Sequence, residues 1–229
     1  GADRVTVAAG PRVGIISTGN EVVPVTATPG PGEVRDANSY LAGAFVTERG
    51  CRPVYFGIVR DEREALKAAV SSALDTCDVV LVSGGSSKDE RDNTAAVVAD
   101  LGEVLVHGVA LAPGKPTIIG TARGRPVIGL PGHPASTFVV LVAIVDHLLA
   151  AMRGTAVSRR TLSARLKQNI PSTRGREDYV RVSVRDGEAV PIFGKSGLLN
   201  TLVQSDGIVR VPASSEGLEV GEEVEVILW

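Results

Sequence analysis

Apolar and polar positions follow two different rhythms along the chain, and the change comes near Thr155. Before it, short apolar runs typical of buried strands take turns with longer segments whose apolar residues recur every three or four positions, as on one face of a helix. The clearest strand, residues 78–82, is apolar without interruption from Val79 onward, as expected of a parallel strand that is buried on both faces. Gly50 and Gly102 close two of the helical segments, which is a usual signal for a helix C-terminus.

The first part of the chain is therefore expected to be an α/β domain over residues 1–154. The expected strands cover residues 13–16, 53–59, 78–82, 103–109 and 126–129. The expected helices cover residues 38–49, 62–76, 91–101 and 134–152. Alternation of this kind predicts three layers, with a mostly parallel sheet and helices on both of its faces.

After Thr155 the apolar stretches become short and alternating, and turns rich in Gly, Pro and Asp separate them. This pattern predicts a small all-β, barrel-like domain over residues 155–229, without a helix longer than two turns. Its expected strands cover residues 161–166, 179–184, 208–211 and 224–228. Residues 159–185 carry eight Lys or Arg and two acids. They form either a solvated β surface or a stretch from which Arg174 or Arg176 reaches an anion held by the first domain.

Composition narrows the class of protein. The chain has 229 residues, 44% of them hydrophobic and 22% charged, as in an ordinary globular protein. A net charge of −2 and only 3% aromatic residues argue against a nucleic-acid partner. The longest apolar run, residues 138–145, is short of the ~20 residues of a membrane span, so a buried helix is expected and a membrane partner is not.

The two cysteines and the lack of a targeting signal bear on the compartment. Cys51 and Cys77 have neither metal-ligand nor disulfide spacing, so we expect small buried hydrophobic residues in a reducing compartment. No signal or transit sequence is recognisable, and a cytoplasmic location is expected.

Two glycine loops stand where an apolar run gives way to a helix: Ser83-Gly84-Gly85-Ser86-Ser87 and Leu130-Pro131-Gly132-His133-Pro134. In such loops, backbone N–H groups close on an oxyanion at a helix N-terminus, where the helix dipole favours negative charge. One loop alone is weak evidence. Two of them, together with carboxylates that follow apolar runs, suggest a site for a phosphorylated ligand and a metal.

Three acids, Glu21, Asp61 and Asp92, lie at or just past the ends of expected strands, the edge at which open α/β sheets bind ligands. Carboxylates beside a phosphate need a cation between them, and Mg²⁺ is the simplest one. A carboxylate could instead act as a general base for water. Asp61 and Asp92 have a structural alternative as helix caps, whereas Glu21 has none in its irregular loop. Lys115, between two prolines, is either aimed at an anion or an ordinary turn lysine.

In their order along the chain, these residues fall into motifs that resemble the molybdopterin molybdenumtransferase family, which includes the C-terminal part of gephyrin. The motifs are Ser17-Thr18-Gly19-Asn20-Glu21, Gly57-Ile58-Val59-Arg60-Asp61, the Ser83 loop with Asp92, Pro113-Gly114-Lys115-Pro116, the Leu130 loop with Ser136, Gly175-Arg176-Glu177-Asp178-Tyr179, and Ser196-Gly197-Leu198-Leu199. The resemblance covers nearly the whole chain.

The resemblance implies that the α/β domain is a molybdopterin-binding domain that holds adenylylated molybdopterin. Molybdate is inserted into the pterin dithiolene and AMP is released in a Mg²⁺-dependent step. Glu21, Asp61 and Asp92 match the family's functional acids, as catalytic or metal-binding groups, and which acid does which stays open. The implied binding positions are Thr18, Gly19, Ser83, Gly84, Gly85, Ser87, Lys115, Pro131, Gly132, Pro134, Ser136, Arg176 and Ser196.

Members of the resembled family are longer, with two further domains N-terminal to the matching region, and their site lies between the α/β domain and an N-terminal domain of the dimer partner. The resemblance therefore implies a homodimer for a longer protein and weak or no catalysis by this chain alone. Tungstate is an alternative oxyanion. The rival functions are a molybdopterin adenylyltransferase, which shares the α/β domain and uses ATP, and a non-catalytic interaction module. The β domain after Thr155 and the lack of a Thr-Gly pair in the Ser83 loop disfavour the adenylyltransferase.

Overall fold

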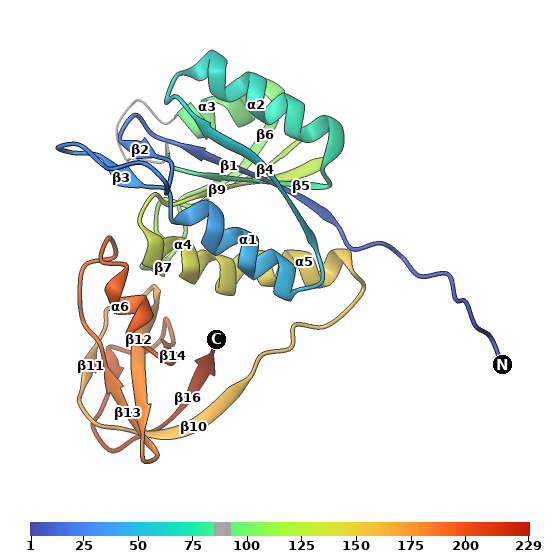
Figure 1. Ribbon diagram of the computed structural model, residues 1–229. Coiled ribbons are helices and arrows are strands. Elements are labelled where there is room, and N and C mark those ends of the chain that lie inside the picture. Colours follow the sequence, from blue (N-terminus) through green and yellow to red (C-terminus); the bar gives the residue numbers. More distant parts are fainter. Residues whose placement is uncertain (85–92) are drawn as a thin grey trace.

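A six-stranded mixed sheet forms the first part of the molecule (Figure 1). The computed structural model describes residues 1–84 and 93–229. The strands are β1 (Arg12–Thr18), β4 (Arg52–Val59), β5 (Val79–Ser83), β6 (Gly102–His107), β8 (Ile118–Ala122) and β9 (Arg125–Leu130). Their order in the sheet is β4-β1-β5-β9-β8-β6. The first four in that order run parallel, whereas β8 and β6 pair antiparallel at the other edge.

Helices cover both faces of this sheet (Figure 1). They are α1 (Asn38–Glu48), α2 (Arg63–Thr76), α3 (Asn93–Leu101), α4 (Pro134–Val140), the π-helical turn η1 (Leu141–Val145) and α5 (Asp146–Met152). One face packs against α1 and the continuous α4-η1-α5 segment, and the other packs against α2 and α3. The expected three-layer α/β arrangement is confirmed.

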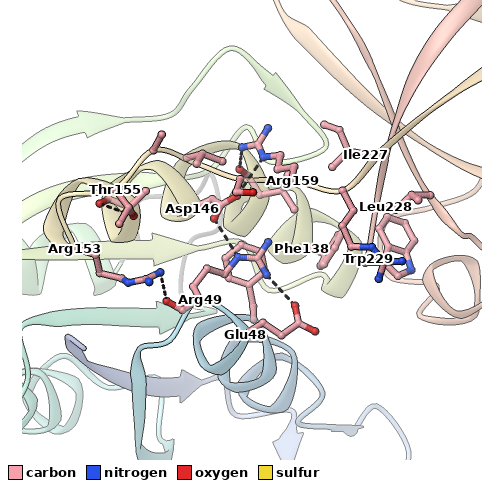
Figure 2. Close-up of a pocket in the computed structure, with 17 residues that line it drawn as sticks. Glu48, Arg49, Phe138, Asp146, Arg153, Thr155, Arg159, Ile227, Leu228 and Trp229 are labelled. Atoms are coloured by element: carbon pink, nitrogen blue, oxygen red, sulfur yellow. Dashed lines mark hydrogen bonds and ion pairs between the residues drawn. The ribbon is translucent and has the colours of Figure 1, made fainter. Parts of the chain in front are cut away.

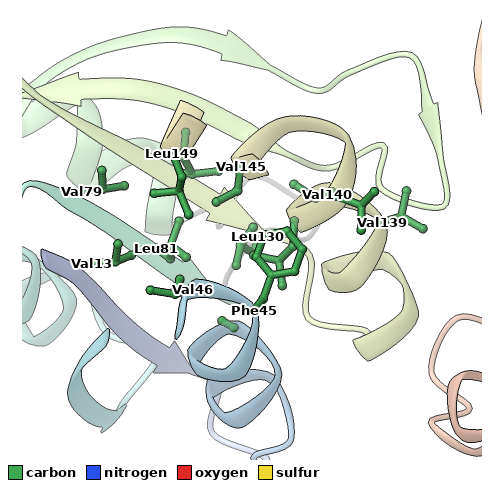
Figure 3. Packing of buried hydrophobic residues seen from close by; sticks show 14 of the residues in the cluster. Val13, Phe45, Val46, Val79, Leu81, Leu130, Val139, Val140, Val145 and Leu149 are labelled. Carbon is green, nitrogen blue, oxygen red and sulfur yellow. The ribbon is translucent and has the colours of Figure 1, made fainter. Parts of the chain in front are cut away.

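Strand β5 shows why its sequence is apolar without interruption. Val79 and Leu81 join the core under α1 and α4-η1-α5, which Figure 3 shows, while Val80 and Val82 join the core under α2 and α3. All four side chains are fully buried. A strand covered on both faces has no position for a polar side chain, which is the pattern of a central parallel strand.

The second part of the chain is a small closed barrel. Its strands are β10 (Thr161–Leu166), β12 (Glu177–Arg185), β13 (Glu188–Pro191), β14 (Gly207–Val211) and β16 (Glu223–Leu228). They follow the order β13-β10-β16-β14-β12, and an additional β12–β13 pairing closes the ring. Short elements complete the chain: β2 (Val22–Val23), β3 (Val34–Arg35), β11 (Ile170–Pro171), α6 (Asn200–Val203) and β15 (Gly217–Leu218). The predicted barrel-like domain is confirmed.

A strand from the first part of the chain belongs to the barrel sheet. Strand β7 (Leu111–Ala112) runs parallel to the start of β12, with Leu111 opposite Glu177. Leu111 also lies in one buried cluster with Tyr179 and Ile208 of the barrel and with residues of α1 and α4. The two domains are therefore joined by sheet pairing and by a shared core. The boundary between residues 154 and 155 stays a prediction.

Three local features differ from the sequence expectations. Strand β8 was not expected; it forms a hairpin with β9 through Arg123-Gly124, both at positive φ (50° and 72°), as in a two-residue type I′ turn. Because of this hairpin, the strand expected at 103–109 is an antiparallel edge strand. The expected helix 134–152 contains the π turn. Helix α2 has Glu62 as its N-cap and no side-chain cap bond, so the capping alternative for Asp61 is wrong.

One described helix is long and apolar enough, by length and composition alone, to cross a membrane: Pro134–Met152, with 19 residues. Inside the protein, 67% of its apolar window is buried, as in a core helix. This agrees with the buried helix expected around residues 138–145. Cys51 and Cys77 are buried and free, as expected.

Candidate functional site

A cavity of about 1090 Å³ opens beyond the carboxyl ends of β1, β5 and β9, between the sheet and the barrel. Open α/β sheets bind their ligands at this edge. The cavity brings together many of the residues singled out in the sequence: Thr18, Glu21, Ser83, Gly84, Lys115, Pro131, Gly132, Pro134, Ser136 and Ser196.

The described start of the first glycine loop, Ser83 and Gly84, meets the second glycine loop at this cavity. A Cβ atom on Gly132 would lie 3.8 Å from the Cα of Gly84, and the N–H of Gly84 donates to the carbonyl of Leu130 at 3.2 Å. Gly84 has a φ of +97°, and a Cβ atom there would lie 2.0 Å from the carbonyl oxygen of Thr18. Both the conformation and the space therefore demand glycine, and the absent side chain lets the ends of β1 and β5 close on each other.

Asn38, the first residue of α1, fastens the two loops together. Its Nδ2 donates to Ser83 Oγ at 2.7 Å and to the carbonyl of Gly132 at 2.8 Å. The residue is only 8% exposed. From the sequence, Asn38 was expected only as the first residue of a helix. An amide side chain at that position does not reveal that its hydrogen-bond partners lie 45 and 94 residues away.

Several buried polar atoms on this wall have no hydrogen-bond partner among the described residues: Ser17 Oγ, Thr18 Oγ1 and Asn38 Oδ1. All three residues line the cavity. Buried polar groups are normally paired, because leaving one unsatisfied costs about 1–3 kcal/mol. These atoms can therefore form hydrogen bonds with a group that enters the cavity.

The start of α4 and a loop of the barrel close one side of the cavity. The N–H of Ala135, in the first turn of α4, donates to the carbonyl of Ser196 at 3.1 Å. The hydroxyl of Ser196 lies 2.9 Å from Nδ1 of His133. Gly197 packs at this point too, since a Cβ atom there would lie 3.4 Å from the His133 ring. The barrel thus contributes directly to the wall of the first domain's cavity.

The acids are only partly gathered. Glu21 lines the cavity, and its carboxylate folds back over Gly19, with both oxygens 2.9 Å from where a Cβ atom of that glycine would be. Asp61 does not line the cavity, contrary to expectation. Its N–H donates to Asn20 Oδ1 at 3.3 Å and its Oδ1 accepts from Asn93 Nδ2 at 2.9 Å. Asp61 therefore links the Glu21 loop to the start of α3, beside the cavity wall.

Of the three acids expected to bind a metal or activate water, the structure describes Glu21 and Asp61. Asp92, Gly85 and Ser87 lie outside the described residues. Within residues 1–84 and 93–229, no three His, Cys, Asp or Glu side chains form a group that could hold a metal ion. The assignment of Glu21 and Asp92 to metal or to water activation stays a prediction.

Arg176 and Gly19 do not line the cavity, although both were expected in the binding site. The Nε of Arg176, just before β12, forms an ion pair at 3.0 Å with Asp178, the second residue of that strand, and this carboxylate holds the guanidinium. Arg174 is exposed and lies 3.6 Å from Glu216. Of the two alternatives for Arg174 and Arg176, the structure favours a solvent-exposed surface of the barrel. It does not favour a contact with an anion bound to the first domain.

The cavity also contains residues that sequence reasoning did not identify. They are Val22, Pro29, Val34, Arg35, Asp36, Ala37, Asn38, Leu111 and Ala112. Arg35 and Lys115 balance the charges of Asp36 and Glu21, so the described wall has no large net charge. Asp36 accepts the N–H of Ser39 at 3.1 Å, which explains an acid just before α1.

Comparisons with known proteins agree with this geometry. Residues 14–151 match the family described as "Probable molybdopterin binding domain", and residues 163–229 match the MoeA C-terminal region (domain IV). A Methanocaldococcus jannaschii protein named for molybdopterin biosynthesis is 36% identical over 224 residues, which is 94% of this chain and 54% of that protein. Molybdopterin molybdenumtransferase 1 of Mycobacterium tuberculosis is 33% identical over an alignment of 239 positions, which covers 99% of this chain and 56% of that protein.

Among solved structures, a MoeA molybdopterin biosynthesis protein from Pyrococcus horikosii has a TM-score of 0.86 and 41% identity over 96% of this chain and 54% of its own. The chain therefore spans about half the length of the relatives that it matches. The first family match alone covers more than half of the chain. The chain belongs to the molybdopterin molybdenumtransferase family, with a molybdopterin-binding domain followed by the MoeA C-terminal domain.

Proposed function

We propose that this chain holds adenylylated molybdopterin in the cavity between the sheet and the barrel, as part of an enzyme that inserts molybdate and releases AMP. The observation that carries the proposal is that Ser83 and Gly84 of the first glycine loop, residues 131–134 of the second, Glu21, Lys115 and Ser196 line one space. Its volume of about 1090 Å³ lies slightly above the ~300–1,000 Å³ of small-molecule pockets, which suits a large ligand that joins a pterin to a nucleotide.

The phosphates of this ligand fit where Gly84 and Gly132 approach each other, because no side chain stands between the backbone and the ligand there. The orphaned hydroxyls of Ser17 and Thr18 supply hydrogen bonds on the same wall. Lys115 adds a positive charge. Leu111 and Leu199 provide apolar surface for a ring.

The oxygen donors of this cavity suit Mg²⁺ only if one or two carboxylates bind the ion together with phosphate oxygens of the ligand and water. Glu21 is the carboxylate that we propose for it, with Asp92 as a second one. When bound, the ion neutralises phosphate charge and stabilises the departing AMP. We propose that turnover requires a longer protein that contains this chain, and that this protein is a homodimer in the cytoplasm, consistent with the buried free cysteines.

The test is calorimetric titration of the chain with adenylylated molybdopterin, with and without Mg²⁺. We expect saturable binding that weakens about tenfold in Lys115→Gln, since one charge-assisted contact contributes roughly 1.4 kcal/mol. Lys167→Gln is the matched control, because Lys167 pairs with Glu188 on the barrel, away from the cavity. Absence of binding, or equal affinity of the two variants, contradicts the proposal.

A second measurement separates binding from chemistry. Adding molybdate to the loaded chain should release AMP slowly or not at all, since the chain spans about half of its relatives. Insertion at full rate would contradict the prediction of a weak or inactive fragment. Offering ATP with free molybdopterin should yield no adenylylated product; its formation would instead identify an adenylyltransferase.

A further inference from the structure

A second cavity, of about 470 Å³, lies between α1, α5 and the end of β16 (Figure 2). It shares no lining residue with the first cavity. Its volume falls within the ~300–1,000 Å³ of small-molecule pockets. Nothing in the proposed function uses this space.

The cavity is rich in arginine. Its charged lining residues are Arg49, Arg153, Arg159, Arg160, Glu48 and Asp146. Counted as side chains, they carry a net charge of +2, four positive and two negative. An excess of guanidinium groups in one cavity favours an anion, above all a phosphate or carboxylate that matches their planar donor fork.

Buried Asp146 holds two of the four guanidinium groups in place. It is 3% exposed, and its two carboxylate oxygens lie 3.1 Å from Arg49 Nε and 3.2 Å from Arg159 Nε. Figure 2 shows both arginines converging on this carboxylate. Arg49 also stacks on Phe45, with its guanidinium carbon 3.6 Å from the ring centroid. This arrangement is a rigid support for the wall of the cavity.

The other two arginines keep donors for a ligand. Arg153 donates through Nη1 to the carbonyl of Arg49, and its Nε and Nη2 have no hydrogen bond to the described residues. The guanidinium of Arg160 makes no hydrogen bond or ion pair with the described part of the chain, and the residue is exposed. These donors belong to the segment that leads from α5 into the barrel.

An aromatic pair forms the opposite wall. Phe138 and Trp229 contact each other edge to face, with centroids 4.9 Å apart and rings at 82°. Trp229 is 43% exposed, so part of its surface remains accessible. Figure 2 shows this pair across the cavity from Arg153. Aromatic side chains beside arginines bind flat rings that carry an anionic group, as in recognition of nucleotides.

We propose that this cavity binds a small phosphorylated compound with a planar ring, such as a nucleoside monophosphate. Its phosphate pairs with Arg153 and Arg160, and its ring packs against Trp229. The inference goes beyond the proposed function, because it concerns a separate cavity, and it holds or fails independently of molybdopterin binding.

The experiment uses the fact that Trp229 is the only tryptophan in the chain. Its fluorescence therefore reports this cavity and not the first one. We expect titration of the full chain with adenosine monophosphate to give a saturable change in emission. Adenosine, which has the ring without the phosphate, should give little or no change at the same concentrations.

The double variant Arg153→Gln/Arg160→Gln should raise the apparent dissociation constant for adenosine monophosphate at least tenfold. Arg174→Gln, which removes an exposed arginine of the barrel outside both cavities, should leave it unchanged. Neither substitution touches the buried ion pairs of Asp146, and circular dichroism verifies that both variants are folded. No change of fluorescence at millimolar ligand, or equal affinity of the double variant and the wild type, would overturn the proposal.

Discussion

Asn38 offers the sharpest test of how the first cavity is assembled. Its amide nitrogen donates to the Ser83 hydroxyl and to the Gly132 carbonyl, at 2.7 and 2.8 Å, and so ties the two glycine loops to the start of α1. Asn38→Ala removes both bonds. Asn38→Asp keeps the shape but replaces the donor with a second acceptor, which then faces two oxygens.

The magnitudes follow from burial. A hydrogen bond contributes roughly 0.5–1.5 kcal/mol, and a buried acceptor left unsatisfied adds about 1–3 kcal/mol, so we expect Asn38→Ala to lower the free energy of unfolding by about 2–3 kcal/mol. In Asn38→Asp the Ser83 hydroxyl can turn to donate to the carboxylate, but the Gly132 carbonyl then faces a negative oxygen. A buried carboxylate without a charged partner costs about 3–5 kcal/mol, so this variant should be worse at neutral pH. Its deficit should shrink as the pH falls, because the protonated carboxyl regains a donor.

Urea denaturation at two pH values measures these differences, provided that all proteins unfold with similar dependence on urea. The matched control is Asn169→Asp, since Asn169 acts as an acceptor, through Oδ1, from the N–H of Val220, and aspartate keeps that bond. Affinity for adenylylated molybdopterin should fall with stability in the two Asn38 variants. If Asn38→Asp is no less stable than Asn38→Ala at neutral pH, the amide is not acting as the donor between the loops.

Three further predictions concern other contacts. Gly84→Ala should abolish ligand binding and destabilise the fold, because its Cβ atom would lie 2.0 Å from the Thr18 carbonyl; calorimetry and thermal melting measure both, and an intact ligand affinity would contradict this. Asp146→Ala should lower the free energy of unfolding by about 1.5–3 kcal/mol, since two guanidinium groups lose a charged partner while Arg49 keeps Glu48 and Arg159 keeps the carbonyl of Val142; a loss under 1 kcal/mol in urea denaturation would refute it. Burial, and then the nearby Glu177 charge, raise the pKa of Tyr179, so the stability of the wild type relative to Tyr179→Phe should fall as the pH rises above about 10, where the unfolded tyrosine ionises first; an unchanged difference in denaturation between pH 8 and pH 11 would argue against this.

Most strands and helices could be predicted, because burial on one or two faces determines how often apolar residues recur along the sequence. Strand β5 and helix α2 are examples: β5 is shifted by one residue at both ends from the expected 78–82, and α2 starts one residue later than the expected 62–76. Strand β8 was harder to predict from its sequence, since Gly120 and Thr121 interrupt the apolar pattern. The π turn within residues 134–152 could not be predicted, because its residues, Leu141–Val145, are as apolar as those of an ordinary helix.

The site was predictable only where a backbone feature limits the residue type. Gly84 and Gly132 could be found because close backbone approach and glycine go together. Asn38 could not, because its partners come from loops far along the chain. Arg176 shows the opposite failure: its motif indicated a role at the site, but a carboxylate two positions away holds its guanidinium.

The pairing of β7 with β12 limits how the first cavity can exchange its ligand. A rotation of the barrel away from the sheet would break the backbone hydrogen bonds between β7 and β12 and expose the buried cluster around Leu111. A hinge motion at the interdomain linker alone therefore cannot open the cavity. Entry and exit must instead depend on small rearrangements at the rim, and a stand-alone first domain would carry Leu111–Ala112 as a strand without its neighbour.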